Sequence, residues 1–141
     1  MAKAPKPVRD DGPRSARLSC PFDGSEMEKL TIEKIVLDRC TGCGAIWLDV
    51  PELSQVLSIE GAAESIDKAP PGQTPRRQKT GEAALLCPRD QTELRLKFDP
   101  VQRHISLLRC PTCLGILLRG GDLVDLSTFT LRERLASFFG H

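Results

Sequence analysis

Six cysteines and two aspartates recur in this chain at spacings that suit a metal ion. The stretch CPFD places Asp23 three positions after Cys20, and CTGC places Cys43 three positions after Cys40. The second half of the chain repeats the set with Cys87, Asp90, Cys110 and Cys113. Zinc takes four ligands in a tetrahedron, drawn from Cys, His, Asp and Glu, and a tight turn directs two of them at one ion. The spacing therefore predicts two structural zinc ions per chain, with these residues as the metal ligands.

Other roles for the cysteines fit the pattern less well. Ordinary buried cysteines would not need fixed partner positions in both halves of the chain. Disulfides would leave an odd cysteine in each half, and a cytosolic chain keeps its thiols reduced. A dithiol redox site at CTGC or CPTC would call for a thioredoxin-like βαβ context, which the sequence does not show.

The two aspartates admit two interpretations. Aspartate can simply stabilise a turn by accepting backbone N–H bonds, and the fourth ligand would then be water, Glu52 or Asp122, or missing. A carboxylate oxygen is also an accepted zinc ligand, and on that preference we favour ligation by Asp23 and Asp90. His104 falls in the middle of a predicted strand, where a surface or cross-strand position suits it better than ligation.

The metal pattern belongs to an internal duplication. Residues 18–57 match residues 85–126, at an offset of 67 up to the first aspartate and of 70 from the second cysteine pair onward. Between the copies, Pro, Gly and polar residues give no apolar period, which predicts a flexible linker. The predicted organisation is a disordered basic tail (1–17), a first zinc ribbon with its helix (18–58, copy one), the linker (59–84) and a second zinc ribbon with a longer C-terminal helix (85–141, copy two).

Within each copy the expected order is knuckle, strand, turn, strand, knuckle and helix, where a knuckle is the tight turn that holds two ligands. In copy two, Leu94, Leu96 and Phe98 alternate with cations, which predicts a half-buried strand. A turn at 99–102 and a return strand over 103–109 then lead to the second knuckle. A hairpin with a knuckle at each end is the zinc-ribbon arrangement. The predicted fold class is a small metal-stabilised α+β protein, with two zinc-ribbon β-hairpin modules, each followed by a helix, joined by a flexible linker.

Each hairpin leads into a predicted helix. In copy one, Asp49 stands at the N-cap and Glu52 follows three residues later, which is a capping-box arrangement. Copy two has Arg119 at the position of Asp49 and loses this cap, but its helix is longer, over 122–139, with an apolar stripe at helical spacing. We expect Trp47 to pack between the hairpin and the helix, the alternative being an exposed anchor for a partner.

Composition limits the compartment and the partners. Aromatic residues make up only 4% of the chain, so a large core cannot be filled and a metal staple is expected. The opening residues carry cations without an apolar run, and no stretch approaches the ~18 apolar residues of a membrane span, which predicts a cytoplasmic protein with no membrane partner. The net charge of +1 gives no overall attraction for nucleic acid, but residues 18–58 carry net −4 and residues 85–121 net +3.

Copy one reads CPFDG, then LDRCTGCGAIWLDVPEL. This resembles the transcription factor IIB-type zinc-finger family, whose ribbons start Cys-Pro-x-Cys or Cys-Pro-x-Asp and continue D-x-C-x-x-C-G-G-x-W-L-D-x-G-E-L. The matching positions are Asp38, Cys40, Cys43, Gly44, Trp47, Leu48, Asp49, Glu52 and Leu53. Copy two resembles the family more weakly, because Leu108, Leu117 and Arg119 replace the first acid, the Trp and the cap Asp. The resemblance implies metal binding by both ligand sets.

The expected function is non-catalytic. Both histidines lie outside the knuckles, no nucleophile–base pair is recognisable, and a zinc ion with four protein ligands has no open position for water. We therefore expect no enzyme activity and no small-molecule substrate, and favour an adaptor or regulatory module with a protein partner. The alternative is nucleic-acid binding through the tail, the linker and the cations of copy two, Arg95, Lys97, Arg103 and Arg109. A redox-sensing zinc switch is a third, less favoured reading.

Overall fold

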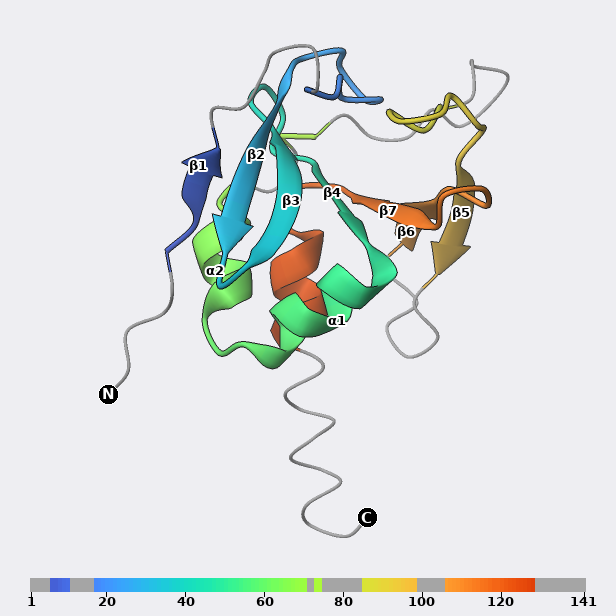
Figure 1. Ribbon diagram of the computed structural model, residues 1–141. Helices are drawn as coiled ribbons and strands as arrows, with labels where there is room; N and C mark the ends of the chain where they lie inside the picture. Colours follow the sequence, from blue (N-terminus) through green and yellow to red (C-terminus); the bar gives the residue numbers. More distant parts are fainter. Residues whose placement is uncertain (1–5, 11–16, 71–72, 75–84, 99–105, 129–141) are drawn as a thin grey trace, which may run out of the picture.

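The two copies are parts of one antiparallel sheet. The computed structural model describes residues 6–10, 17–70, 73–74, 85–98 and 106–128. Their seven strands lie in the order β1-β2-β3-β4-β7-β6-β5 (Figure 1). The strands are β1 (Val8–Asp10), β2 (Met27–Ile32), β3 (Ile35–Cys40), β4 (Ile46–Asp49), β5 (Arg95–Phe98), β6 (Ser106–Arg109) and β7 (Gly115–Leu118). Each copy therefore contributes a hairpin and a third strand after its second knuckle, which extends the predicted ribbon by one strand.

The copies join through β4 and β7, which pair antiparallel at the centre of the sheet. The register pairs are Ile46 with Leu118, Trp47 with Leu117, Leu48 with Ile116 and Asp49 with Gly115. At the repeat offset of 70, Trp47 corresponds to its own partner Leu117. Ile46 corresponds to Ile116 and Leu48 to Leu118, so the two flanking pairs are equivalent and the register is symmetric about the Trp47–Leu117 pair. The duplicated sequence thus forms a structure with an internal two-fold relation.

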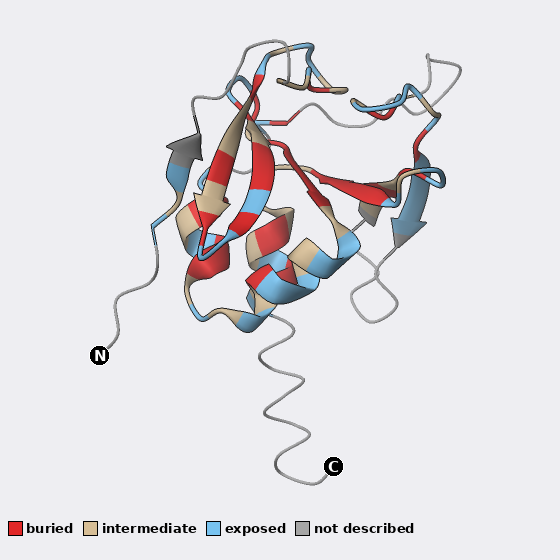
Figure 2. Cartoon of the chain, viewed as in Figure 1, coloured by how far each residue is buried: buried red, intermediate tan, exposed pale blue. Residues whose placement is uncertain are grey.

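One face of the sheet is covered by helices. Helix α1 (Val50–Ser58), helix α2 (Ala62–Ile66) and a helical segment at 122–128 lie together on this face (Figure 1). Their apolar side chains pack against alternate residues of the central strands, and these positions are buried (Figure 2). Burying a single Leu or Ile side chain contributes about 1.5–3 kcal/mol, so this layer is the main apolar core of a chain with few aromatics.

Helix α1 begins as the sequence predicts. Asp49 is its N-cap and forms a capping box with Glu52, whose carboxylate accepts the backbone N–H of Asp49 at 2.8 Å. The preceding hairpin turns at Glu33 and Lys34, which both have positive φ, as the tight two-residue turns between twisted strands require. The strand-to-helix path of copy one is therefore set by local sequence.

The structure differs from the predicted linker over residues 59–70. Helix α2 lies there, and its Ala62, Ala63 and Ile66 are buried against α1 and the sheet. Asp67 follows α2 and is also buried; its carboxylate accepts the N–H of Gly121 at 2.7 Å and of Val124 at 3.2 Å. These are donors at the start of the 122–128 helix, so Asp67 supplies the cap that copy two lacks locally. Residues 59–70 contain too few apolar residues to show helical periodicity, so the sequence does not predict α2.

The predicted tail also contains an ordered element. Within residues 1–17, β1 pairs with β2, with Val8 opposite Thr31 and Asp10 opposite Lys29. The predicted final helix over 122–139 is seen only at 122–128, and residues 129–139 lie outside the described part of the chain. The predicted turn at 99–102, His104 and His141 lie outside it as well.

Trp47 occupies a different place from the one expected. It is fully buried, but in a second apolar cluster on the face opposite the helices, together with cysteines of both copies and Leu94, Leu108 and Leu117. Its ring lies against the backbone of Gly115, where an added Cβ would come within 2.1 Å of Trp47 Cζ2. Trp47 therefore packs between the two copies, neither under the helix nor as an exposed anchor. No helix among the described residues is long and apolar enough to cross a membrane.

Candidate metal centres

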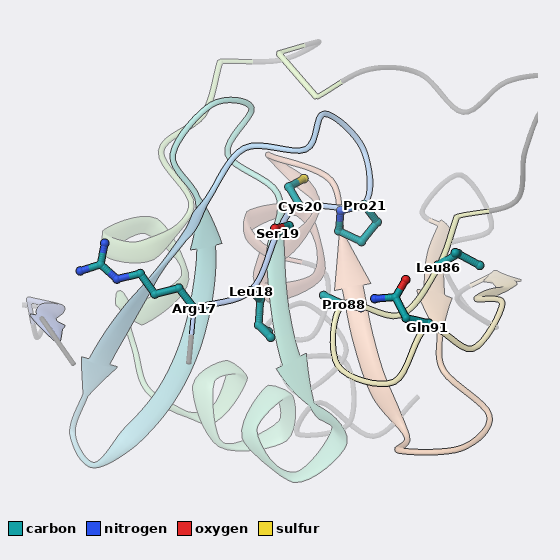
Figure 3. Close-up of a pocket in the computed structure, with 8 residues that line it drawn as sticks. All are labelled: Arg17, Leu18, Ser19, Cys20, Pro21, Leu86, Pro88 and Gln91. Carbon is teal, nitrogen blue, oxygen red and sulfur yellow. The ribbon is translucent and has the colours of Figure 1, made fainter. Parts of the chain in front are cut away.

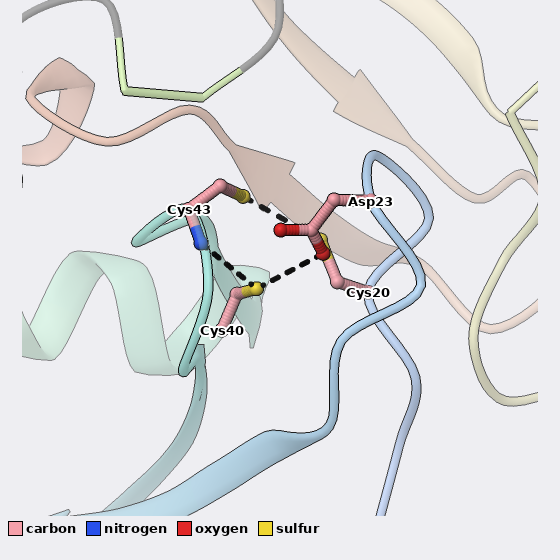
Figure 4. Close-up of side chains that lie close together, drawn as sticks. All are labelled: Cys20, Asp23, Cys40 and Cys43. Carbon is pink, nitrogen blue, oxygen red and sulfur yellow. Dashed lines mark hydrogen bonds between the residues drawn. The ribbon is translucent and has the colours of Figure 1, made fainter.

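The first predicted ligand set comes together at the end of the copy-one hairpin. Cys20 and Asp23 come from the knuckle before β2, and Cys40 and Cys43 from the knuckle after β3 (Figure 4). The Sγ atoms of Cys20 and Cys43 are 3.7 Å apart, and Cys40 Sγ lies 3.3 Å from Asp23 Oδ1. The three cysteines are buried, whereas Asp23 is exposed and closes the site toward solvent.

The second set repeats this arrangement at the end of the copy-two hairpin. The Sγ atoms of Cys87 and Cys113 are 3.6 Å apart, and Cys110 Sγ lies 3.6 Å from both carboxylate oxygens of Asp90. In each set, one candidate ligand atom from every residue lies within 4.8 Å of the others. Both groups therefore contain three sulfurs and one carboxylate around a common centre.

These separations match the edges of a zinc tetrahedron. With Zn–S near 2.3 Å and Zn–O near 2.0 Å, tetrahedral geometry requires about 3.8 Å between two sulfurs and about 3.5 Å between sulfur and oxygen. The corresponding separations are 3.6–3.7 Å and 3.3–3.6 Å. Each group could hold one zinc ion once its remaining ligand atoms, which lie within 4.8 Å of one another, close to these separations.

Each aspartate combines the two roles that the sequence leaves open. Asp23 Oδ1 accepts the backbone N–H of Ser25 at 2.9 Å, and Asp90 Oδ1 accepts that of Thr92 at the same distance. These turn-forming bonds hold the carboxylate beside the cysteines. Burial acts to raise the pKa of Asp23, but the bonds from Ser25 and from the Cys40 thiol outweigh it and lower the pKa; the bond from Thr92 lowers the pKa of Asp90. Both carboxylates are thus kept in the anionic form that a cation needs.

Most of the cysteine thiols must lose a proton before they can bind zinc. Burial raises the pKa of Cys20 and Cys43 above the usual thiol value and that of Cys87 to about 12. Burial also acts to raise the pKa of Cys110, but the backbone N–H groups of Cys113 and Thr112 hold it below the usual value. Without metal most of these sulfurs hold their protons at neutral pH, so zinc binding must release protons.

The knuckles share one backbone device. The residue after each ligand pair donates its N–H back to the carbonyl of the first ligand and has positive φ. In copy one this residue is glycine, Gly24 and Gly44, whereas copy two places Gln91 and Leu114 there. Amide groups inside the turns also point at sulfur; for example, Cys43 N–H donates to Cys40 Sγ at 3.3 Å. Because side chains in the left-handed region cost about 1–2 kcal/mol per residue, the knuckles of copy two are more strained than those of copy one.

Three residues that support the sites carry no signal in the sequence. Gln73 Nε2 donates to the carbonyl of Gly42 at 2.8 Å, and Thr74 Oγ1 donates to the carbonyl of Cys43 at 2.9 Å. Thr74 Oγ1 also accepts the N–H of Gly120 at 2.8 Å and so ties the first site to copy two. Arg89, beside the second site, lies over the Trp47 ring at 5.9 Å and pairs with the cap residue of α1, so it too connects the copies.

A cleft of about 380 Å³ separates the first knuckles of the two copies (Figure 3). Its walls are residues 17–21, at the first knuckle of copy one, and residues 86–91, at the first knuckle of copy two. The lining residues are Arg17, Leu18, Ser19, Cys20, Pro21, Leu86, Pro88 and Gln91. Its lining thus contains no histidine and no carboxylate, and its thiol belongs to the first ligand set.

Comparison with known proteins agrees with the ligand geometry. Residues 19–59 match the model of a family described as the transcription factor zinc-finger, a zinc ribbon of the transcription factor IIB type. This match covers the first ligand set and helix α1. No curated protein and no solved structure matches the chain significantly. Copy one is therefore a zinc ribbon of this type, and the second ligand group fits a divergent second copy of it.

Proposed function

We propose that this chain is a non-catalytic adaptor, in which two zinc ribbons form one rigid platform for a protein partner. The observation that carries the proposal is the pairing of β4 with β7, which makes both ribbons parts of a single sheet. Arg89 and Thr74 add contacts between the copies. Two ribbons fixed in this way present a constant surface, which suits recognition of one partner better than two modules on a flexible linker would.

The absence of catalysis is part of this proposal. Each ligand set offers four protein donors, and a zinc ion held by four such donors has no position for an activated water. The described cleft offers no base to activate a nucleophile. Hydrolysis of any ester by the zinc-loaded protein, together with water exchange at zinc, would contradict this part of the proposal.

We further propose that Asp23 and Asp90 complete the two tetrahedra. Metal analysis of the purified protein should then give about two zinc ions per chain. Asp23→Ala should weaken zinc binding at the first site by at least about tenfold, and Asp23→Cys should preserve it. A single ion per chain would contradict the two-site assignment, and an unchanged affinity in Asp23→Ala would reduce the aspartate to a turn residue.

The adaptor role is tested by co-purification of the tagged full chain with and without a zinc chelator. Because zinc binding and folding are coupled in small ribbons, we expect partners to be retained only by the zinc-loaded protein. Identical recovery of partners after complete removal of zinc would contradict a role for the folded platform.

A second candidate function is nucleic-acid binding, favoured by the cations of β5 and β6. Arg95 and Lys97 are exposed on β5, and Arg109 follows on β6; Arg103 lies outside the described residues. This function predicts retention on nucleic acid that falls steeply with salt and is lost when Arg95 and Lys97 become alanine. No retention at low salt would exclude it.

A further inference from the structure

We propose that the outer edge of β5 binds an extended acidic segment of a protein partner by strand addition. This inference rests on the adaptor function and specifies the chemistry of the partner. Strand β5 ends the sheet, and among the described residues no strand pairs with its outer side. Figure 2 shows this strand as exposed, in contrast to the buried central strands.

The first argument is a pair of like charges. Arg95 lies directly opposite Arg109 in the β5–β6 ladder. The equivalent pair in copy one is Glu28 opposite Arg39, and there the guanidinium donates to Glu28 Oε1 from Nε at 3.1 Å and from one terminal nitrogen at 2.7 Å. Copy two therefore lacks the carboxylate that satisfies this arginine in copy one. Like charges directly opposite each other destabilise a sheet unless an anion lies between them.

The second argument is an unsatisfied donor. Arg109 Nε is buried and has no hydrogen-bond partner among the residues that the structure describes. Buried hydrogen-bond donors are rarely left without an acceptor. A guanidinium N–H forms its strongest hydrogen bonds with oxyanions, so a carboxylate of a bound ligand would suit this donor. Lys97 lies two residues after Arg95, so its side chain leaves β5 on the same face. No ion pair within the described residues joins these three cations to a carboxylate.

The third argument is the open backbone beside these cations. Leu94 donates its N–H away from β6, to the carbonyl of Leu85, and since strand residues alternate, the peptide groups of Leu96 and Phe98 also face outward. In copy one the equivalent edge is occupied, because β1 pairs there with Asp10 opposite Lys29, the counterpart of Leu96. This edge of the ribbon can therefore accept a strand.

The geometry of strand addition defines the incoming sequence. Residues directly opposite Arg95 and Lys97 would share the face of these cations, and the residue between them would lie beside Leu96, which is 37% exposed. The expected segment is therefore acidic, apolar, acidic in alternation. At the repeat offset of 67, the chain's own counterpart of β1 is residues 75–77, with the sequence Pro-Arg-Arg. This sequence is a poor partner for β5, because its arginines carry the same charge as Arg95 and Lys97 and its proline has no N–H to donate. Nucleic acid would contact the cations but would leave the open peptide groups and Leu96 without partners.

The test uses the zinc-loaded full chain and a synthetic peptide, Gly-Ser-Glu-Val-Glu-Val-Glu-Gly. Binding is followed by amide chemical shifts and hydrogen exchange. We expect saturable binding with slowed exchange at the Leu96 N–H, and affinity at least about tenfold weaker for a peptide of equal composition with its valines adjacent. Arg95→Glu should abolish binding, while the matched charge reversal Lys68→Glu, at an exposed site in the segment after α2, should leave it unchanged.

Arg95→Glu also separates lost recognition from lost folding. It restores the carboxylate that copy one has at Glu28, so the variant should be at least as stable as the parent protein, with Arg109 paired internally. Peptide binding that survives Arg95→Glu would overturn the proposal, as would binding of oligothymidylate without binding of the peptide. Tighter binding of a peptide of residues 75–84 would reassign the edge to the chain itself and overturn it too. If co-purified partners stay bound to Arg95→Glu, the result would support the adaptor function but contradict binding at the β5 edge.

Discussion

Removal of the Asp67 carboxylate should weaken the whole fold, although this residue lies far from both ligand sets in sequence. Its two oxygens accept N–H bonds of 2.7 and 3.2 Å from Gly121 and Val124. No other capping acceptor lies near in sequence, since Arg119 stands where copy one has Asp49. Asp67 therefore joins the segment after α2 to the last described helix and so to copy two.

The magnitude follows from two opposing contributions. Loss of an N-cap acceptor costs about 0.5–2 kcal/mol, and a donor left without a partner in a buried site costs about 1–3 kcal/mol. Against this, burial raises the pKa of Asp67 despite the bonds from Gly121 and Val124, so the ionised carboxylate is itself costly to bury. We expect Asp67→Ala to lower the free energy of unfolding by about 2 kcal/mol. Asp67→Asn keeps one acceptor and removes the buried charge, so it should cost less than about 1 kcal/mol.

The assay is urea unfolding of zinc-loaded protein at a fixed free-zinc concentration, because bound metal adds to the apparent stability. Fluorescence of Trp47 reports on the contact between the copies and circular dichroism on the helices. The matched control is Glu60→Ala, which removes an exposed carboxylate just before α2 and should change stability by less than about 0.5 kcal/mol. The reasoning is refuted if Asp67→Ala behaves like this control, or if Asn costs as much as Ala.

Three further predictions use the same assay. Gly115→Ala should destabilise by about 2–3 kcal/mol and change Trp47 fluorescence, because the new Cβ would overlap the indole ring; a silent substitution would contradict the packing described. Leu114→Gly should stabilise by about 1 kcal/mol, since Leu114 has φ of 66° and is half exposed; a loss of stability would show that its side chain matters more than its backbone. Burial, opposed by Arg119, raises the pKa of Asp122 to about 6, so the native state holds this proton longer than the unfolded state. The contribution of Asp122 to stability should therefore fall as pH rises from about 4 to 6, measured as the difference between the parent protein and Asp122→Asn, in which the pH dependence of zinc binding cancels. Asp122→Asn should remove that fall and exceed the parent at neutral pH by up to about 3 kcal/mol, whereas a difference independent of pH would contradict it.

The sequence contains the local parts of this molecule. Cys20 and Asp23 predict a knuckle because the spacing of two ligands is fixed by one tight turn, and Asp49 with Glu52 predicts a helix start because the capping box is a local device. The duplication doubles the weight of each signal. For this reason the ligand sets, both hairpins and the start of α1 could be predicted without coordinates.

The long-range parts could not be predicted in this way. Nothing in β4 taken alone shows that its free edge pairs with β7, since an apolar strand reads the same whether it is covered by a helix, a partner or a repeat. For this reason the sequence alone places Trp47 on the wrong side of the sheet, under the helix, whereas it lies in the cluster on the opposite face. Asp67 and Thr74 stand among polar and Pro-rich residues that read as linker, and their roles depend on donors in copy two.

The joint between the copies shows how a symmetric register can still be specific. The β4–β7 pairing is symmetric, so by register alone copy one could pair with copy one of another chain. Packing is not symmetric, because the Trp47 ring lies against the backbone of Gly115, and the copy-one counterpart of Gly115 is Ala45. If two first copies paired in this register, each indole would meet a Cβ at a separation that no real contact allows. Trp47 and Gly115 therefore act together to favour pairing between unlike copies, and the duplication has become a heterotypic interface within one chain.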